Sequence, residues 1–204
     1  MKEIRAFDFE VRAEQNEEHG SYITGQPIVY NEPTDLGWYR EIIADGALNE
    51  ADLRDVRFLV NHNTDMIPLA RSRNNNTNST MQLSVVPGKG MEIRVDLDTE
   101  NNTEAKNLYS AVKRGDISGM SFMFTTDADE WEDMDTDYPT RTITQIGKVF
   151  EVSAVTFPAY EATSIAARGL SDALEGAKTS LESAKASKEA IEKRKRLIRL
   201  LTEV

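Results

Sequence analysis

Few residue types in this sequence could carry out covalent catalysis. Its 204 residues include no cysteine and only two histidines, His19 and His62. Without cysteine there is no thiolate nucleophile, no disulfide and no cysteine-ligated metal. Two histidines are also too few for a three-histidine metal site. A nucleophilic enzyme built from this chain must therefore use a serine or threonine, with very few side chains able to act as its base.

His62 is the better placed of the two histidines to act as a base. It shares strand parity with Phe58 and Val60, so we expect its side chain on the face that these apolar residues bury. His19 lies in an acidic turn, residues 14–20, and is expected at the surface. A hydrogen-bonded core histidine would show the same pattern, so the pattern alone leaves a structural role for His62 open.

Ser121 is the candidate nucleophile. It lies within an apolar strand pattern, on the opposite face from Phe122 and Phe124. A serine hydroxyl is a poor nucleophile unless a neighbouring base takes its proton, and His62 is the one plausible base in the sequence. A serine inside an apolar strand is also often structural, so this pairing is a hypothesis.

Glu151 is the candidate for a third catalytic residue. It shares strand parity with residues that are otherwise apolar or small. A buried carboxylate requires a cationic or hydrogen-bonding partner, because leaving it unpaired is strongly unfavourable. That partner is either His62, in a Ser-His-acid arrangement, or an arginine such as Arg71 or Arg141.

The elements that must position these residues are mainly short strands between turn signals. A Pro-Gly loop, residues 87–90, predicts a hairpin between strands at 81–86 and 91–97. Two helices are expected, a short one near 49–55 and a longer one at 103–114 that Gly115 ends. The fold class is therefore mainly β with flanking helices, α+β. Further strands are expected at 5–11, 23–30, 120–125, 141–146 and 149–157.

An acidic stretch, residues 127–137, is the one candidate for a metal site. It lacks the glycine at the sixth position and the closing glutamate of a calcium-binding loop. We therefore interpret it as a solvated loop and predict neither a metal nor a cofactor.

The chain divides into two predicted domains, residues 1–168 and 169–204. The second has eight basic and six acidic residues, a net charge of +2. The whole chain has a net charge of −11, so the first domain carries −13. The apolar residues of the second domain follow heptad-like spacing, so we expect an amphipathic helix of about 54 Å that projects or pairs. It would serve in docking or self-association, or be removed by self-cleavage. The acidic charge argues against direct nucleic-acid binding, and the absence of long apolar segments argues against membrane insertion and for a cytoplasmic protein.

Several motifs, in their order and spacing, resemble the prohead maturation proteases of tailed bacteriophages. The resemblance implies a serine endopeptidase that trims the capsid protein or its scaffold segment inside the immature capsid in the host cytoplasm. These proteases are distantly similar to herpesvirus assembly proteases, which implies a β-barrel protease core like that of herpesvirus assemblin. The motifs are Tyr39-Arg40-Glu41-Ile42-Ile43, Gly46-Ala47, Asn61-His62, Pro68-Leu69-Ala70-Arg71, Met120-Ser121-Phe122-Met123-Phe124, Glu151-Val152-Ser153 and Pro158-Ala159-Tyr160.

The resemblance implies a role for each candidate residue. Ser121 attacks the scissile carbonyl, His62 takes and returns the proton, and Glu151 orients His62. Backbone amides stabilise the oxyanion, with Arg71 as a candidate helper. Two other function classes are weighed against this one: a non-catalytic assembly or scaffold protein with a protease-like barrel, and a carboxylate-metal enzyme that uses the acidic stretch. The expected partner is the major capsid protein or its scaffold segment, with a possible homo-oligomer through the C-terminal helix.

Overall fold

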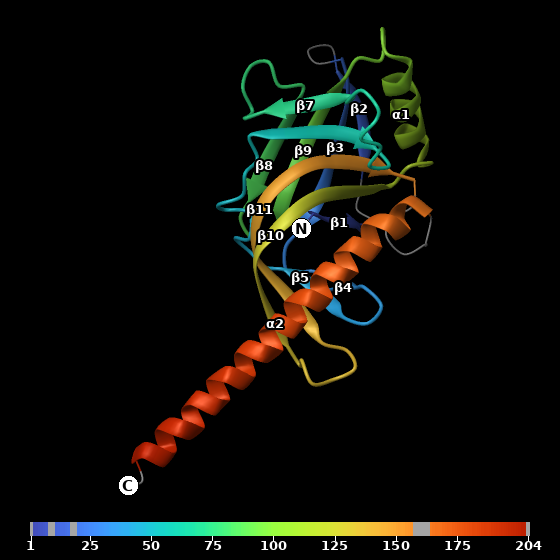
Figure 1. The fold of residues 1–204 in the computed structure, drawn as a ribbon. Coiled ribbons are helices and arrows are strands. Elements are labelled where there is room, and N and C mark those ends of the chain that lie inside the picture. The colour runs from blue at the N-terminus through green and yellow to red at the C-terminus, as the bar shows by residue number, and fades with distance from the viewer. Residues whose placement is uncertain (1, 8–10, 17–19, 157–163, 203–204) are drawn as a thin grey trace.

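The computed structural model describes residues 2–7, 11–16, 20–156 and 164–202, which form two sheets and two helices (Figure 1). The smaller sheet has four strands in the order β2 (Arg12–Asn16), β3 (Gly20–Val29), β9 (Gly90–Leu97) and β8 (Met81–Val86). The larger has the order β1 (Lys2–Phe7), β10 (Gly119–Glu132), β11 (Thr140–Val155), β5 (Arg40–Ile43) and β4 (Thr34–Asp35), with β6 (Asp55–Val60) paired to β11 and to β7 (Ala70–Arg73).

This architecture confirms the α+β prediction, including the C-terminal helix. The helices are α1 (Thr103–Arg114) and α2 (Ser164–Thr202). The strand pairs of the described residues form two separate sheets, and closure into a barrel stays a prediction. Apolar side chains from both sheets and from α1 form one core, in which Phe122 and Phe124 stack with ring centroids 4.7 Å apart.

β10 and β11 form a long antiparallel ribbon that is more continuous than predicted. The strands expected at 141–146 and 149–157 are one strand, β11, as far as Val155, and β10 continues through 127–132 of the stretch interpreted as a solvated loop. The pairing register shifts between Met123 and Asp129, so the strand alternation is interrupted there. Gly147 lets the backbone of β11 lie close to the Asp127 side chain of β10, because a Cβ atom at this position would lie 2.2 Å from Asp127 Oδ1.

The short helix predicted near 49–55 is wrong. Turns occupy residues 45–50, and β6 begins at Asp55. Besides its own turn hydrogen bonds, this segment bonds to β11: Ile146 N–H donates to the Ala47 carbonyl, and Asp52 N–H donates to the Gly147 carbonyl, both at 2.8 Å. A tertiary pairing therefore replaces a local helix.

The longer helix and the hairpin are where the sequence predicted them. Asn102 caps α1, since its side chain accepts hydrogen bonds from the backbone N–H groups of Glu104 and Ala105, and Gly115 ends it in the left-handed region with φ 79°. β8 and β9 form the predicted hairpin. At its turn, Gly90 has φ 129° and passes so close to β3 that a Cβ atom would lie 2.0 Å from the Ile28 carbonyl oxygen.

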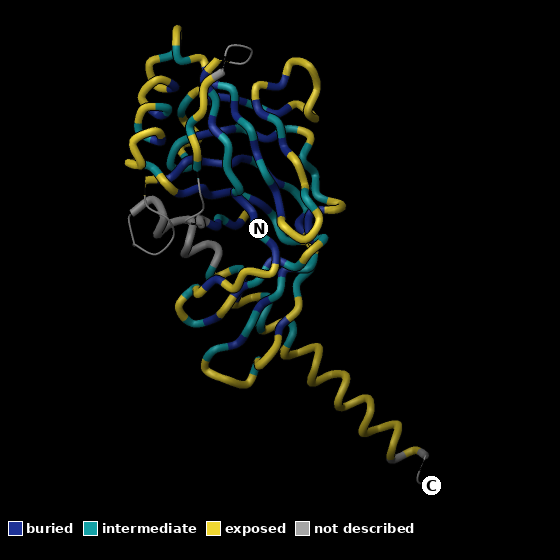
Figure 2. Tube along the Cα trace, turned by 180° about the vertical axis from the view of Figure 1, so that it is seen from behind, coloured by how far each residue is buried: buried dark blue, intermediate teal, exposed yellow. Residues whose placement is uncertain are grey.

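α2 is predicted correctly as an amphipathic helix, but its two halves differ. Near its start, Ala177 is buried against Tyr39 and Trp131, and Leu174 and Leu181 pack on the same cluster. Its far end projects away from the sheets and is exposed along its length (Figures 1 and 2). The helix begins at Ser164, before the predicted domain boundary at 168/169. Neither helix in the described ranges combines the length and apolar character needed to cross a membrane.

We predict that Gly90→Ala lowers the free energy of unfolding by about 2–4 kcal/mol, because it combines a backbone clash with an unfavourable φ. Gly88→Ala is the matched control, since Gly88 also has positive φ (73°) but nothing lies within 4 Å of its added Cβ. The control should lose about 1 kcal/mol. Urea unfolding measures both, and equal losses would contradict the close approach of β9 to β3.

Candidate active site

The structure brings Ser121, His62 and Glu151 together. His62 Nε2 lies 2.5 Å from Ser121 Oγ, and His62 Nδ1 lies 2.5 Å from Glu151 Oε1. One imidazole therefore contacts the hydroxyl through one ring nitrogen and the carboxylate through the other. This is the atom order that a serine nucleophile, a general base and an orienting acid require.

Strand register explains this convergence. β10 and β11 pair with Ser121 directly opposite Ser153, so Glu151, two residues from Ser153, faces the same side of the sheet. β6 runs parallel to β11 on its other side, with Val60 beside Ala154. The chain leaving β6 therefore reaches the same end of β11.

His62 reaches the site from a turn, not from a strand as its parity predicted. β6 ends at Val60, and Asn61 and His62 both have left-handed backbone, with φ 51° and 54°. Asn61 is tied to the end of β11: its N–H donates to the Ala154 carbonyl (3.0 Å), and its side-chain oxygen accepts from Thr156 N–H (2.9 Å). These bonds hold a backbone conformation that is uncommon for a non-glycine residue.

The site is largely shielded from water. Ser121 and Glu151 are 0% and 2% exposed, and the His62 side chain is 10% exposed. Ser121 Oγ also lies 2.8 Å from the Arg5 carbonyl oxygen on β1. The hydroxyl has a single proton, so it donates either to this carbonyl or to His62 Nε2. A low-dielectric site strengthens whichever interaction is made.

The arginines offered as alternative partners of Glu151 are bound to other carboxylates. Arg71 Nε donates to Asp55 Oδ1 at 2.6 Å. Arg141 contacts Glu3 at 2.7 Å and Asp129 at 2.6 Å. The Arg71 guanidinium donates to both carboxylate oxygens of Asp55, so its role as an oxyanion helper stays a prediction.

Behind Ser121, a buried ion network fixes β1 against the larger sheet. The Arg5 guanidinium pairs with Glu41 and, at 2.8 Å, with Glu3, while Arg141 binds both carboxylates. Burial by itself would raise the pKa of Glu3. Hydrogen bonds from Arg141 and the charge of Arg5 outweigh burial and lower the pKa of Glu3 to about 2. This network places the Arg5 carbonyl beside Ser121.

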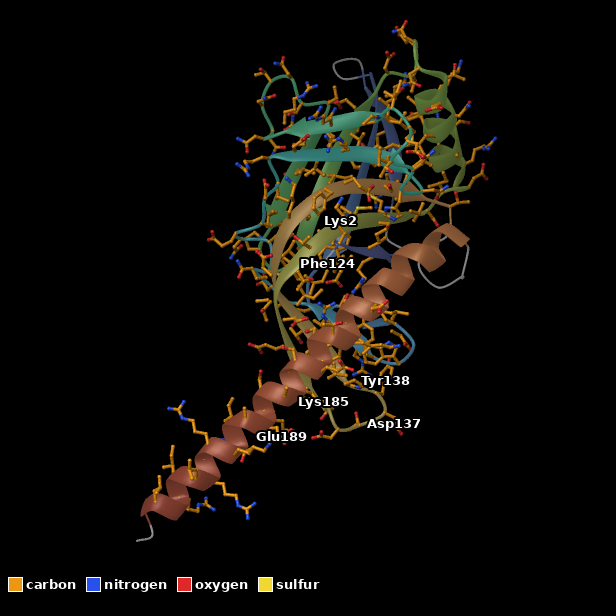
Figure 3. The ribbon with its side chains drawn as sticks, viewed as in Figure 1. Lys2, Phe124, Asp137, Tyr138, Lys185 and Glu189 are labelled. Carbon is orange, nitrogen blue, oxygen red and sulfur yellow. The ribbon has the colours of Figure 1, made fainter. Side chains whose placement is uncertain are left out.

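No group of three metal-binding side chains occurs within the described ranges, which include the acidic stretch. Two of its carboxylates pair with cationic side chains: Asp129 with Arg141, and Asp135 with Lys188 of α2 at 2.9 Å. The hydrogen bond from Lys188 lowers the pKa of Asp135. In Figure 3 the turn that carries Asp137 and Tyr138 lies beside α2.

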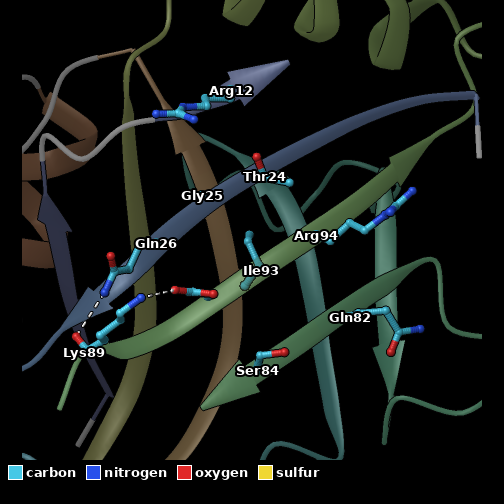
Figure 4. A pocket seen from close by; sticks show the side chains of 10 residues that line it. Arg12, Thr24, Gly25, Gln26, Gln82, Ser84, Lys89, Ile93 and Arg94 are labelled. Atoms are coloured by element: carbon cyan, nitrogen blue, oxygen red, sulfur yellow. Dashed lines mark hydrogen bonds and ion pairs between the residues drawn. The ribbon is translucent and has the colours of Figure 1, made fainter. Parts of the chain in front are cut away.

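Some predicted features lie elsewhere or outside the described residues. His19, Phe157 and the Pro158-Ala159-Tyr160 motif fall in the parts of the chain that are not described. A hollow of about 710 Å³ lies over the smaller sheet, bordered by Gln82 and Arg94 among others, and none of the three catalytic candidates lines it (Figure 4). Sequence reasoning also missed Ser153, whose position opposite Ser121 was visible only once the strands were paired.

Comparison with known proteins finds a family that matches this chain. The family model described as caudovirus prohead serine protease matches residues 7–175. No curated protein and no solved structure shows a significant match to the chain. The match covers most of the chain and includes Ser121, His62 and Glu151.

We predict that Glu3 makes stability depend on pH. A carboxyl group whose pKa is lowered from 4.5 to about 2 on folding contributes its stability above pH 4.5 and loses it as pH falls towards 2. The loss amounts to about 3 kcal/mol. In Glu3→Gln, stability should be lower at pH 7 and should fall less steeply across this window, as measured by urea unfolding.

Glu50→Gln, at an exposed glutamate, is the control and should change stability by less than about 0.5 kcal/mol at pH 7. A Glu3→Gln protein with the same steep loss below pH 4.5 as the wild type would show that the network does not hold Glu3 ionised.

Proposed function

Because the chain belongs to the caudovirus prohead serine protease family, we propose that Ser121, His62 and Glu151 are its catalytic residues. The single observation that carries this proposal is that one imidazole contacts Ser121 Oγ and Glu151 Oε1 through its two nitrogens, each at 2.5 Å. The proposed substrate is the major capsid protein or its scaffold segment, cleaved inside the immature capsid in the host cytoplasm.

In the proposed reaction, Ser121 Oγ forms a bond to the scissile carbonyl carbon while His62 Nε2 takes the hydroxyl proton. Glu151 accepts the Nδ1–H bond and stabilises the imidazolium. His62 then gives the proton to the leaving amine, the C–N bond breaks, and an acyl-enzyme remains. Water attacks the acyl carbon, its proton passes to His62, and the proton returns to Ser121 Oγ as the acid leaves.

The developing oxyanion must be stabilised by donors close to Ser121. Backbone N–H groups are the proposed donors, because they are fixed in place before the reaction begins. Arg71 could assist only if its guanidinium left the Asp55 carboxylate, to which it donates two hydrogen bonds at 2.6 and 2.9 Å.

We predict that Ser121→Ala abolishes processing of the capsid substrate, with a rate at least about 10³-fold below that of the wild type, and leaves the fold intact. Glu151→Gln should also lose at least about 10²-fold, because a neutral amide cannot stabilise the imidazolium. Gel or mass analysis of capsid protein incubated with each variant gives the rates. Ser72→Ala, at a buried serine bonded to Asn75, is the control and should process normally.

The same measurement separates the serine protease from the non-catalytic assembly protein. Undiminished processing by Ser121→Ala would rule out the serine mechanism. A wild-type protein that leaves capsid protein uncut would favour the non-catalytic assembly protein. Wild type and Ser121→Ala incubated alone test self-cleavage, since loss of C-terminal fragments from the wild type only would show that the chain is its own substrate.

For the exposed end of α2, we propose docking to an acidic helical segment of the capsid protein or scaffold. Residues 188–199 hold six basic and two acidic side chains. The exposed apolar residues Ile191, Leu197, Ile198 and Leu201 lie in or just beyond this segment. Parallel pairing with a second copy would bring like charges together, whereas an acidic partner would cover both the charge and the apolar face.

We predict that Ile198→Asp raises KM for the capsid substrate about tenfold and leaves kcat unchanged, because it removes apolar contact from docking and not from the chemistry. Lys178→Asp, a charge reversal at an exposed position on the packed half of α2, is the control. Light scattering across protein concentrations tests the alternative. A dimer that Ile198→Asp dissociates would assign this surface to self-association instead.

A further inference from the structure

Ser153 connects two members of the proposed triad through one hydroxyl group. Its Oγ lies 2.6 Å from Glu151 Oε2 and 3.1 Å from the backbone nitrogen of His62. Ser153 is fully buried and lies directly opposite Ser121 in the β10–β11 pairing. The hydroxyl is therefore enclosed among the three residues and has no access to solvent.

The direction of these hydrogen bonds follows from the groups involved. A backbone N–H can only donate, and an ionised carboxylate can only accept. Ser153 Oγ thus accepts from His62 and donates its single proton to Glu151. Each carboxylate oxygen then has its own donor, Nδ1–H of His62 at Oε1 and the Ser153 hydroxyl at Oε2. Two donors on opposite oxygens fix the plane of the carboxylate.

The bond to the His62 backbone acts on the imidazole itself. Asn61 and His62 form a left-handed turn, and the backbone and side chain of Asn61 hydrogen-bond to the end of β11. The Ser153 hydroxyl accepts the hydrogen bond that holds the backbone of His62 itself. It therefore sets both the backbone from which the imidazole extends and the carboxylate towards which Nδ1 points.

We infer that Ser153 is a positioning residue of this protease, one that fixes the positions of Glu151 and His62 relative to each other without contacting the substrate. The inference rests on the proposed function and adds a residue to it. Ser72 is the comparison, as a buried serine outside the site. It is equally buried, but its hydroxyl bonds to Asn75, which follows β7.

The test compares Ser153→Ala with Ser72→Ala in steady-state cleavage of the capsid substrate. Ser153→Ala is expected to lower kcat about 10- to 100-fold with KM unchanged, because a small misplacement of the catalytic groups slows chemistry without weakening binding. Ser72→Ala should keep both constants. Ser153→Thr retains the hydroxyl and is expected to recover most of the lost kcat.

A second readout does not depend on turnover. In the Ser121→Ala background, the proton on His62 Nδ1 should give a downfield NMR resonance, and with two histidines in the chain His19→Gln suffices to assign it. Adding Ser153→Ala is expected to shift or broaden this resonance, whereas adding Ser72→Ala is not. Thermal unfolding of each variant checks that it is folded at the temperature of these measurements.

The outcomes separate this inference from the function on which it rests. Normal kcat in Ser153→Ala, an unchanged resonance, or a Ser153→Thr enzyme as slow as the alanine variant would overturn the role of Ser153 and leave the triad standing. Full processing by Ser121→Ala would instead overturn the proposed function.

Discussion

The pairing of β10 with β11 is the constraint on which both the site and the placement of α2 depend. Its register puts Ser121 opposite Ser153 and brings Glu151 onto the same face. Because β6 pairs with the other edge of β11, the turn that carries His62 meets these side chains at the end of the strand. At its far end the same ribbon carries Trp131, on which α2 packs. A slip of one residue would turn Ser121 and Glu151 to the opposite face.

Buried ion pairs hold β1, the strand beside Ser121, against the larger sheet. Arg5 and Arg141 share Glu3 and Glu41, so none of these groups is left without a partner in the low-dielectric interior. Arg141 also binds Asp129, which accepts a hydrogen bond from Ser180 of α2 at 2.8 Å. The network therefore extends from the strand beside the nucleophile to the C-terminal helix.

Sequence reasoning succeeded where the signal was local. The helix at Thr103–Arg114 has its own capping residues, and the hairpin of β8 and β9 has its own turn. It failed at residues 49–55, where backbone groups pair with β11, and within 127–132, where an acidic segment is held in a strand by its partner. Local propensity gives way in both places to hydrogen bonds with residues distant in the chain.

What the sequence determined by itself was the inventory of possible chemistry: no cysteine, one credible histidine base and a serine for it to act upon. Composition settles this because a missing functional group cannot be supplied by folding. The tertiary structure decided which groups meet. It turned Arg71 and Arg141 towards other carboxylates, presented His62 from a left-handed turn, and placed Ser153 between His62 and Glu151. Those outcomes depend on strand register, which is set by pairing between residues up to about a hundred positions apart.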